Sequence, residues 1–303
     1  MTYEELLASE ANKNSNLYVL TAENRAAIRN LHTVMKDRFI DVGIAEQTMI
    51  GLAAGLAARG RRPVVHALSA FLTMRAFEFI RSTAGLPNLP VVLVGAIPGF
   101  LSEANGPTHQ AIEDIALMRM IPGMQVFAPS SNDELLESMR LALAADTPSY
   151  IRFFAGDAPL EKPIYGSVPE GCWYSEGTDI TLITTGFLLH ETFKAKALLE
   201  NTGKSVGILS LPQLSPAPAK AVLKALQSSK KIVAIEDHFE TGGLSSIVRE
   251  VFAENSSLIK IPQPVIHCIS LKTKWFEPLL LPDVLEHEGF TGKKLAERIL
   301  KNE

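Results

Sequence analysis

The stretch FIDVGIAEQTMIGLAAGLAARG, residues 39–60, joins a short β-rich run to a helix of small and apolar residues. We expect the helix to run from about Ile44 to Arg59 and to end at Gly60. Because small side chains let other backbone approach closely, this helix is expected to lie in an interface. Its first turn holds one carboxylate, Glu46. An acidic residue there favours the helix dipole in many proteins, so Glu46 alone does not predict a site.

Strands and helices alternate outward from this stretch through the first half of the chain. The strand-like runs are LYVL, RFIDV, PVVHAL, LPVVLVGA, QVFAP and SYIRF, and the helical patterns between them cover about residues 44–59, 70–84, 109–120 and 132–145. Apolar strands separated by crossover helices predict a parallel, doubly wound α/β sheet that is covered on both faces.

The segment 155–179 loses this periodicity and gathers Pro and Gly, as a connection between domains does. The alternation then restarts with the runs DITLITTG, SVGILSL, KIVAIED and PVIHCIS, with helical patterns at about 188–201, at about 218–228 and after Gly243. We therefore predict two doubly wound α/β domains, over residues 1–155 and 179–303, joined by a linker over 156–178.

The composition narrows the classes of partner. A net charge of -4 and an isoelectric point near 6.0 leave no basic surplus for a phosphate backbone, which argues against nucleic acid. The two cysteines are too few for a disulfide framework or a metal cluster. The N-terminal residues lack the pattern of a signal peptide, and no apolar run has the length of a membrane span. We expect a soluble, cytoplasmic protein that binds no membrane.

A second motif, SEANGPTHQAIEDIALMRMIPGM, occupies residues 102–124. Asn105, Gly106 and Pro107 predict a tight turn that brings His109 to the start of a helix. There the imidazole can face a cleft at the carboxyl end of the preceding strand. By itself, a histidine in that position is equally typical of a helix cap or a surface group.

In this order, GIAEQ, SAFLTMRAFEF and GPTHQ resemble the pyrimidine-binding domain of transketolases, and TLITTG and IEDHFETGGLSS resemble the transketolase C-terminal domain. The resemblance covers nearly the whole chain and starts at the second of the family's three domains. It implies the C-terminal subunit of a split, two-chain transketolase. Such an enzyme uses thiamine diphosphate to transfer a two-carbon ketol unit from a ketose donor to an aldehyde acceptor.

The resemblance also assigns roles to residues. Glu46 matches the glutamate that hydrogen-bonds the aminopyrimidine ring nitrogen of the cofactor, and Phe71 matches an aromatic residue that packs on that ring. A carboxyl group in an apolar, water-poor pocket is suited to sharing a proton with a weakly basic ring. His109 matches a catalytic histidine beside the cofactor amino group and the donor hydroxyls. Asn105 stands where transketolases carry an aspartate that binds a substrate hydroxyl.

Half of the family's cofactor site is missing from the sequence. Transketolases hold the diphosphate through a metal bound by a GDG motif, and the nearest match here, Gly156-Asp157-Ala158, lies in the predicted linker. We therefore expect Mg²⁺ or Ca²⁺ to be bound by a separate N-terminal transketolase subunit that carries the diphosphate-binding domain. The family arrangement implies two copies of each chain.

The substrate end departs from the family pattern. The arginine that binds a sugar phosphate in transketolases falls at Ala155, and the phosphate-side histidine falls near Ile97 or Pro98. Arg75, Arg152 or a residue of the partner remains as a replacement. We expect small, sugar-like substrates that differ from the standard sugar phosphates.

Two alternatives stay open at this point. The β subunit of a 2-oxo-acid dehydrogenase shares the two-domain plan, but the GPTHQ motif favours a transketolase. A catalytically silent scaffold subunit would keep the fold and the interface, but the presence of both Glu46 and His109 argues against it.

Overall fold

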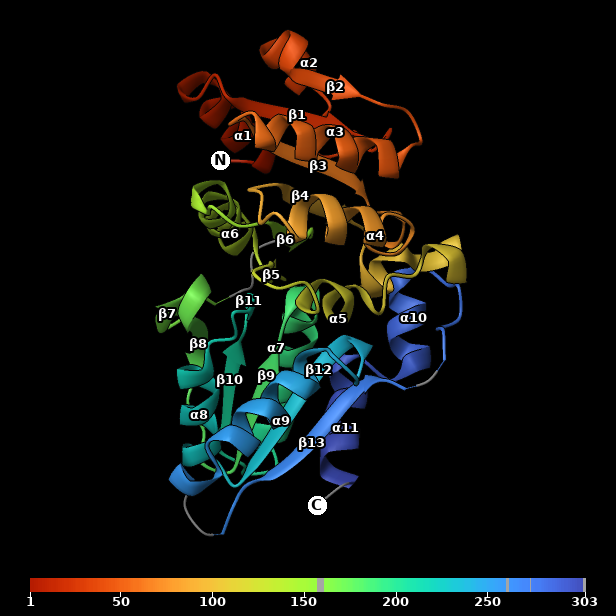
Figure 1. Cartoon of the computed structure of the whole chain (residues 1–303). Coiled ribbons are helices and arrows are strands. Elements are labelled where there is room, and N and C mark those ends of the chain that lie inside the picture. The colour runs from red at the N-terminus through yellow and green to blue at the C-terminus, as the bar shows by residue number, and fades with distance from the viewer. Residues whose placement is uncertain (157–160, 260–261, 273, 302–303) are drawn as a thin grey trace.

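The computed structural model describes residues 1–156, 161–259, 262–272 and 274–301. The chain forms two β-sheets with their helices, one above the other in Figure 1. The upper sheet has seven strands and the lower sheet has six. This arrangement confirms the predicted pair of doubly wound α/β domains.

The first sheet has the strand order β11-β5-β6-β4-β3-β1-β2. Its strands are β1 (Leu17–Thr21), β2 (Phe39–Asp41), β3 (Arg62–Leu68), β4 (Val92–Ala96), β5 (Gln125–Phe127), β6 (Ser149–Arg152) and β11 (Gln213–Ser215). All neighbours pair in parallel except β11, which is antiparallel to β5. Long apolar runs form these strands because both faces of the sheet are buried.

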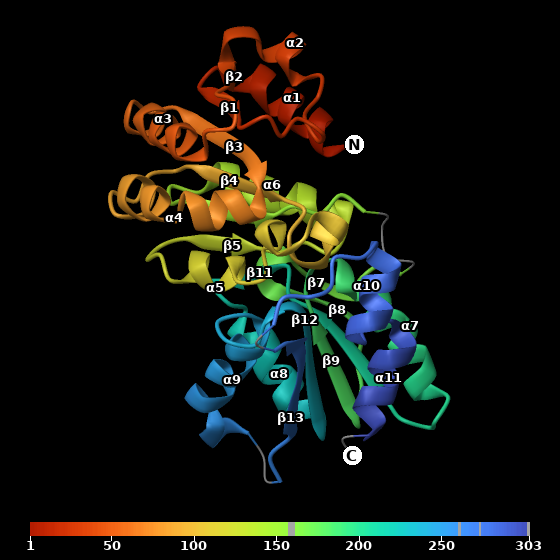
Figure 2. The same ribbon diagram turned by 90° about the vertical axis from the view of Figure 1, so that its right-hand side faces the viewer.

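Helices cover both faces of this sheet (Figure 2). One face packs against α1 (Tyr3–Lys13), α2 (Leu31–Met35) and α6 (Asn132–Ala144). The other packs against α3 (Glu46–Ala58), α5 (Asp114–Arg119) and a continuous segment made of η2 (Phe71–Arg75), α4 (Phe77–Phe79) and η3 (Ile80–Gly85). The α3 helix and the η2–η3 segment thus bring the stretches GIAEQ and SAFLTMRAFEF to the same side of the sheet.

The second sheet has the strand order β13-β12-β9-β10-β8-β7. Its strands are β7 (Tyr165–Ser167), β8 (Gly171–Ser175), β9 (Ile180–Thr184), β10 (Val206–Ser210), β12 (Lys231–Phe239) and β13 (Val265–Leu271). The helices α7 (Leu189–Glu200) and α11 (Gly292–Lys301) cover one face, and α8 (Ala219–Ser228) and α9 (Leu244–Glu254) cover the other. The last connecting helix, α10 (Leu281–Glu288), packs against η4 (Gly99–Asn105) of the first domain. In the part of the chain that the structure describes, no helix is long and apolar enough to span a bilayer.

The predicted linker over 156–178 is wrong in one part. Strands β7 and β8 lie within it, and β8 pairs with β10, so the second sheet starts before residue 179. These strands are too short and too rich in glycine for a two-residue alternation to reveal them. Asp157 and Ala158 of the Gly-Asp-Ala match lie outside the described residues.

A buried ion-pair network joins the two domains. The Arg152 side chain is 3% exposed, and its Nε donates to Asp114 Oδ2 at 3.0 Å. Its Nη1 pairs with Asp237 of the second domain, and the Tyr150 hydroxyl donates to Asp114 at 2.7 Å. Burial would lower the pKa of Arg152, but Asp114 and Asp237 raise it above its ordinary value. The guanidinium therefore stays charged and fixed between the domains.

Candidate active site

Glu46 is the first residue of α3, and its side chain is 3% exposed. No side chain caps this end of the helix. Among the described residues, the side-chain partner of Glu46 is Arg75, whose Nη1 donates to Oε2 at 3.1 Å. A carboxylate that only complements a helix dipole loses nothing by staying in water, whereas burial of its charge is unfavourable. The burial of Glu46 beside an arginine therefore indicates a further role.

Arg75 also contacts Phe71, four residues earlier in η2. The guanidinium carbon lies 4.1 Å from the centre of the Phe71 ring, which is a cation–π contact. The segment is π-helical here, and the Ala76 amide donates to the Phe71 carbonyl at 3.2 Å. Wide turns of this kind insert an extra residue into a helix and are frequent at functional sites. In this turn Arg75 reaches Glu46 and covers the Phe71 ring at the same time.

His109, which lies in the second motif, is the last member of the cluster. Its ring packs against Phe71 edge to face, with the ring centres 4.9 Å apart. The Nδ1 atom of His109 lies 3.0 Å from the hydroxyl of Thr108. The cluster thus runs from Glu46 through Arg75 and Phe71 to His109, and it combines a carboxylate, a guanidinium, an aromatic face and an imidazole.

The helix predicted to start at His109 begins later. Pro107–His109 form one 3₁₀ turn, and α5 starts only at Asp114. Between them, the Ala111 carbonyl accepts a hydrogen bond at 2.9 Å from the amide of Gly99 in the first domain. The Ile112 carbonyl accepts one at 2.9 Å from the amide of Phe239 in the second domain. These bonds leave the intervening backbone unavailable for a helix. His109 is therefore held by a loop that is tied to the domain junction.

Asn105 lies apart from this cluster. Its side chain is exposed, and Nδ2 donates to the Ser102 carbonyl at 2.6 Å. The structure thus brings together Glu46, Phe71 and His109, and it leaves Asn105 in the loop at the end of η4.

Sequence reasoning missed the contact between Arg75 and Glu46. It named Arg75 only as a replacement phosphate ligand. The available signal was the spacing of Phe71 and Arg75, because residues four apart lie on one face of a helical segment. The arginine's reach to the start of α3 depends on how two distant segments pack, which no local pattern contains.

The positions at which the family pattern places phosphate ligands hold no side-chain donor. Ala155 is exposed and has no side-chain donor, and Ile97 and Pro98 offer only apolar side chains. Arg152 is bound by Asp114 and Asp237, so it is not free to receive a phosphate.

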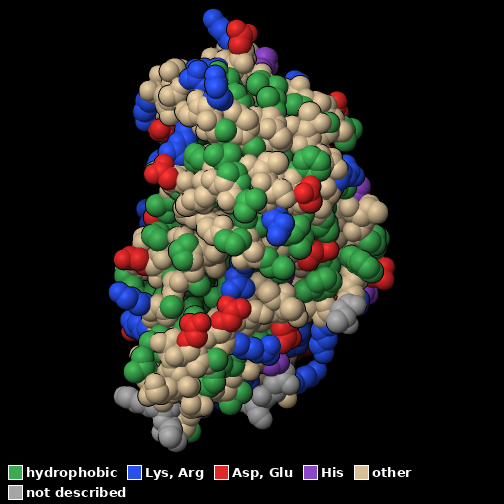
Figure 3. Space-filling view, in the orientation of Figure 1, with side chains coloured by type: hydrophobic (Ala, Val, Ile, Leu, Met, Phe, Trp, Pro, Cys, Tyr) green, Lys and Arg blue, Asp and Glu red, His purple; other side chains and the backbone are tan. Residues whose placement is uncertain are grey.

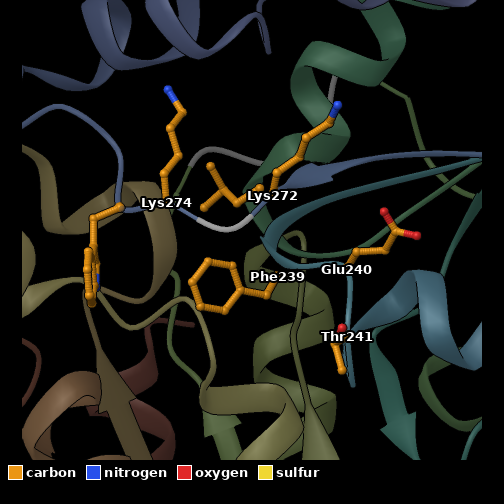
Figure 4. A pocket seen from close by; sticks show the side chains of 7 residues that line it. Phe239, Glu240, Thr241, Lys272 and Lys274 are labelled. Carbon is orange, nitrogen blue, oxygen red and sulfur yellow. The ribbon is translucent and has the colours of Figure 1, made fainter.

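A cavity of about 640 Å³ opens at the ends of β12 and β13, and in Figure 4 the side chains of Lys272 and Lys274 extend away from Phe239. Its lining consists of Phe239, Glu240, Thr241, Leu271, Lys272, Lys274 and Trp275. None of the cluster residues belongs to this lining. The cavity is therefore separate from the cluster around Glu46.

Comparisons with known families identify the chain. Residues 1–158 match the family described as the transketolase pyrimidine binding domain, and residues 173–295 match the transketolase C-terminal domain. This chain belongs to the transketolase family. Both of the resemblances drawn from sequence motifs are confirmed.

Its relatives include transketolase subunits. The 6-deoxy-6-sulfo-D-fructose transketolase subunit of Clostridium sp. strain MSTE9 is 34% identical, over 97% of this chain and 91% of that protein. A transketolase subunit of Actinobacillus succinogenes that is named for apulose-4-phosphate is 33% identical, over 74% of this chain and 73% of that protein. A solved structure described as a split gene transketolase in an inactive beta4 tetramer is 28% identical with a TM-score of 0.85, and the match covers 99% of this chain and 96% of that one.

The chain is thus a transketolase-like subunit, its split-gene homologues imply a partner subunit, and its family depends on thiamine diphosphate. The transketolase match favours this assignment over a dehydrogenase β subunit. The cluster fits the aminopyrimidine half of the cofactor, because it offers a buried carboxylate, an aromatic face and an imidazole. For the diphosphate half, no group of three or more His, Cys, Asp or Glu side chains within the described ranges is placed to hold a metal.

Proposed function

We propose that this chain supplies the aminopyrimidine side of a thiamine diphosphate site in a two-chain enzyme. The enzyme transfers a two-carbon ketol unit from a ketose donor to an aldehyde acceptor. The observation that carries the proposal is the cluster of contacts around buried Glu46. Arg75 contacts both Glu46 and Phe71, and Phe71 in turn packs against His109. A silent scaffold has no need for a buried carboxylate at that place.

The roles of the side chains follow from their chemistry. When bound, the cofactor supplies the electron sink that stabilises the carbanion of the two-carbon unit. Glu46 exchanges a proton with the aminopyrimidine ring nitrogen, and Phe71 packs on the ring and excludes water from it. His109 orients the donor hydroxyls and helps to move a proton between them and the amino group. Asn105 donates a hydrogen bond to a substrate hydroxyl from the end of η4.

The metal and the diphosphate belong to the partner in this proposal. The cluster offers a single carboxylate, whereas Mg²⁺ or Ca²⁺ takes several oxygen ligands. A separate N-terminal subunit with the diphosphate-binding domain therefore completes the site.

One face of α3 supports an assembly with two copies of each chain. Its exposed residues are Thr48, Gly51, Leu52, Gly55 and Ala58, and Ile44 is exposed just before the helix. A Cβ atom added to Gly51 or Gly55 meets nothing within 4 Å, so this face is open in the chain alone. Figure 3 shows hydrophobic side chains gathered over α3, α4 and α5, with few charges among them. A helix that is apolar on all sides is normally covered, and here the cover is another subunit.

The substrate, in this proposal, is a sugar that is not bound through a terminal phosphate in the usual transketolase way. A phosphate dianion in a partly dry cleft needs charge-assisted donors. Ala155, Ile97 and Pro98 offer none, and Arg152 is occupied by two carboxylates. One relative is named for a sulfonated sugar, which supports this proposal, whereas the other is named for a sugar phosphate, apulose-4-phosphate.

The test is reconstitution with the partner subunit. Calorimetry on this chain alone should detect no tight, metal-dependent binding of thiamine diphosphate, and the assembled pair should bind it. The pair's kcat/KM is then compared for two groups of substrates. One group holds xylulose 5-phosphate and ribose 5-phosphate, and the other holds unphosphorylated and sulfonated ketoses and aldehydes. Tight binding to the isolated chain refutes the shared site, and a clear preference for the two standard phosphates refutes the substrate class.

A further inference from the structure

The buried pair of Glu46 and Arg75 uses only one oxygen of the carboxylate. Arg75 donates to Oε2 at 3.1 Å. Oε1 accepts no hydrogen bond from any residue that the structure describes. Oε1 is not one of the buried side-chain atoms that lack a partner, so it stays accessible at the surface of the described chain. The geometry therefore leaves Oε1 available for a ligand.

Arg75 is constrained at both ends. Its guanidinium stacks on Phe71 at 4.1 Å, and its backbone carbonyl accepts a hydrogen bond at 3.4 Å from Nε2 of Gln47, the residue after Glu46. The side chain is 43% exposed, so its stem reaches in from the surface. The π-helical turn of η2 places Arg75 over the ring that precedes it by four residues. Such a planar, doubly held guanidinium defines the orientation of the carboxylate that it binds.

We propose that Arg75 is the positioning residue of this site: it holds Glu46 Oε2 and one face of Phe71, and so directs Oε1 at the aminopyrimidine ring nitrogen. This inference rests on the proposed function. It adds that the carboxylate alone is insufficient, because an unheld Glu46 samples orientations in which Oε1 points away from the ring. Arg75 also balances the charge of Glu46, which lets the carboxylate remain in a water-poor pocket until the cofactor arrives.

A rival role follows from the same contacts and predicts the opposite result. A guanidinium is planar and resembles the amidine edge of an aminopyrimidine, so Arg75 is also shaped to occupy the place of the cofactor ring. In that case Arg75 competes with thiamine diphosphate, and its removal tightens cofactor binding. If Arg75 positions Glu46, its removal weakens cofactor binding.

The experiment compares Arg75→Ala, Arg75→Lys and Arg81→Ala in the assembled two-chain enzyme. Arg81 is the matched control, since it is an exposed arginine of the same segment and its side chain makes no hydrogen bond or ion pair with any described residue. The readouts are the dissociation constant of thiamine diphosphate by calorimetry and the near-ultraviolet circular dichroism of the bound cofactor, which reports the state of its aminopyrimidine ring. Thermal unfolding verifies that each variant is folded.

Positioning predicts that Arg75→Ala raises the dissociation constant by about tenfold, the size expected for one charge-assisted hydrogen bond. It also predicts a reduced aminopyrimidine signal at cofactor saturation. Arg75→Lys should partly restore the cofactor affinity and the circular dichroism signal, because lysine keeps the positive charge but lacks the planar guanidinium. Arg81→Ala should match wild type in both measurements. Tighter binding by Arg75→Ala, or binding and a signal equal to those of Arg81→Ala, overturns the inference. If the wild-type pair binds no thiamine diphosphate, the proposed function fails and this inference fails with it.

Discussion

Substitution of Glu46 tests whether the cluster takes part in catalysis. Its side chain is 3% exposed, yet it carries a charge that the first turn of a surface helix would accommodate in water. In the assembled enzyme, Glu46→Ala should lower kcat by at least about 100-fold, since proton transfer by a positioned side chain contributes that much or more. Fold and assembly should stay intact, as measured by circular dichroism and size-exclusion chromatography.

The control for this variant is Glu78→Ala. Glu78 is an exposed glutamate of α4 that accepts a hydrogen bond from Ser82 at 2.9 Å, and its loss should leave kcat unchanged. If Glu46→Ala keeps near wild-type turnover, the glutamate only complements the helix dipole and the proposed role is wrong.

Sequence reasoning reached some residues of the candidate site and not others. Glu46, Phe71 and His109 lie in motifs whose order along the chain is visible in the sequence, and the structure places them in one cluster. The role of Arg75 was not visible, because its contact with Glu46 joins segments 29 residues apart through a π-helical turn. Asn105 was assigned to a substrate hydroxyl because it stands at the position of the family's aspartate, and in the structure its amide donates to the Ser102 carbonyl.

At the scale of an element, we predict that the exposed face of α3 binds the partner subunit. Leu52 is 39% exposed on this face, next to two glycines that leave the helix surface open. Leu52→Asp should abolish or strongly weaken assembly with the partner, because an unpaired charge at the centre of an apolar interface is costly to bury. The measurement is the mass of the mixed complex by light scattering, together with thermal unfolding of the chain alone.

Leu198→Asp is the matched control. Leu198 is 41% exposed on α7 in the second domain, so the same change of charge should leave assembly unaffected. If both variants assemble as well as wild type, the α3 face is not the interface.

Elements with strong local patterns were predicted well. Apolar runs revealed the central strands because strands buried on both faces must be apolar along their whole length. The strands β7, β8 and β11 were missed, since they lie in stretches rich in Gly and Pro and their pairing depends on distant partners. Strand β11 lies in the second half of the chain but pairs with β5 of the first sheet, a crossover that no local signal contains. The predicted helix over 70–84 exists, but two π-helical segments interrupt it.

At the scale of the whole molecule, the Arg152 network holds the two domains together. Arg152→Met should lower the free energy of unfolding by about 3–5 kcal/mol, because it leaves Asp114 and Asp237 buried without their cation. Urea denaturation measures the change. The control is Arg249→Met, which breaks an exposed pair with Glu240 and should cost less than about 1 kcal/mol. Equal losses in the two variants would mean that the buried network contributes no more than a surface pair.

A second junction between the domains depends on pH. Glu134 of α6 is buried, and it accepts hydrogen bonds from the Ser130 amide at 2.6 Å and from the hydroxyl of Tyr174 in β8 at 3.2 Å. Burial raises the pKa of Glu134 to about 7, although both hydrogen bonds act in the opposite direction. The folded protein therefore keeps the proton on Glu134 to about pH 7, whereas the unfolded chain releases it near pH 4.5. The stability that this group contributes is fully present below pH 4.5 and is lost as the pH rises through about 7.

Glu134→Gln removes this proton and keeps one carbonyl oxygen for the Ser130 amide, while its NH₂ group can donate to the hydroxyl oxygen of Tyr174. The free energy of unfolding of the variant, relative to wild type, should therefore rise between pH 4.5 and about 7. Because one pKa unit corresponds to roughly 1.4 kcal/mol, the whole change should be about 3 kcal/mol. Urea denaturation of both proteins across this pH range provides the measurement. Parallel stability curves for the two proteins would contradict the prediction, because they would show that Glu134 exchanges no proton on unfolding in that range.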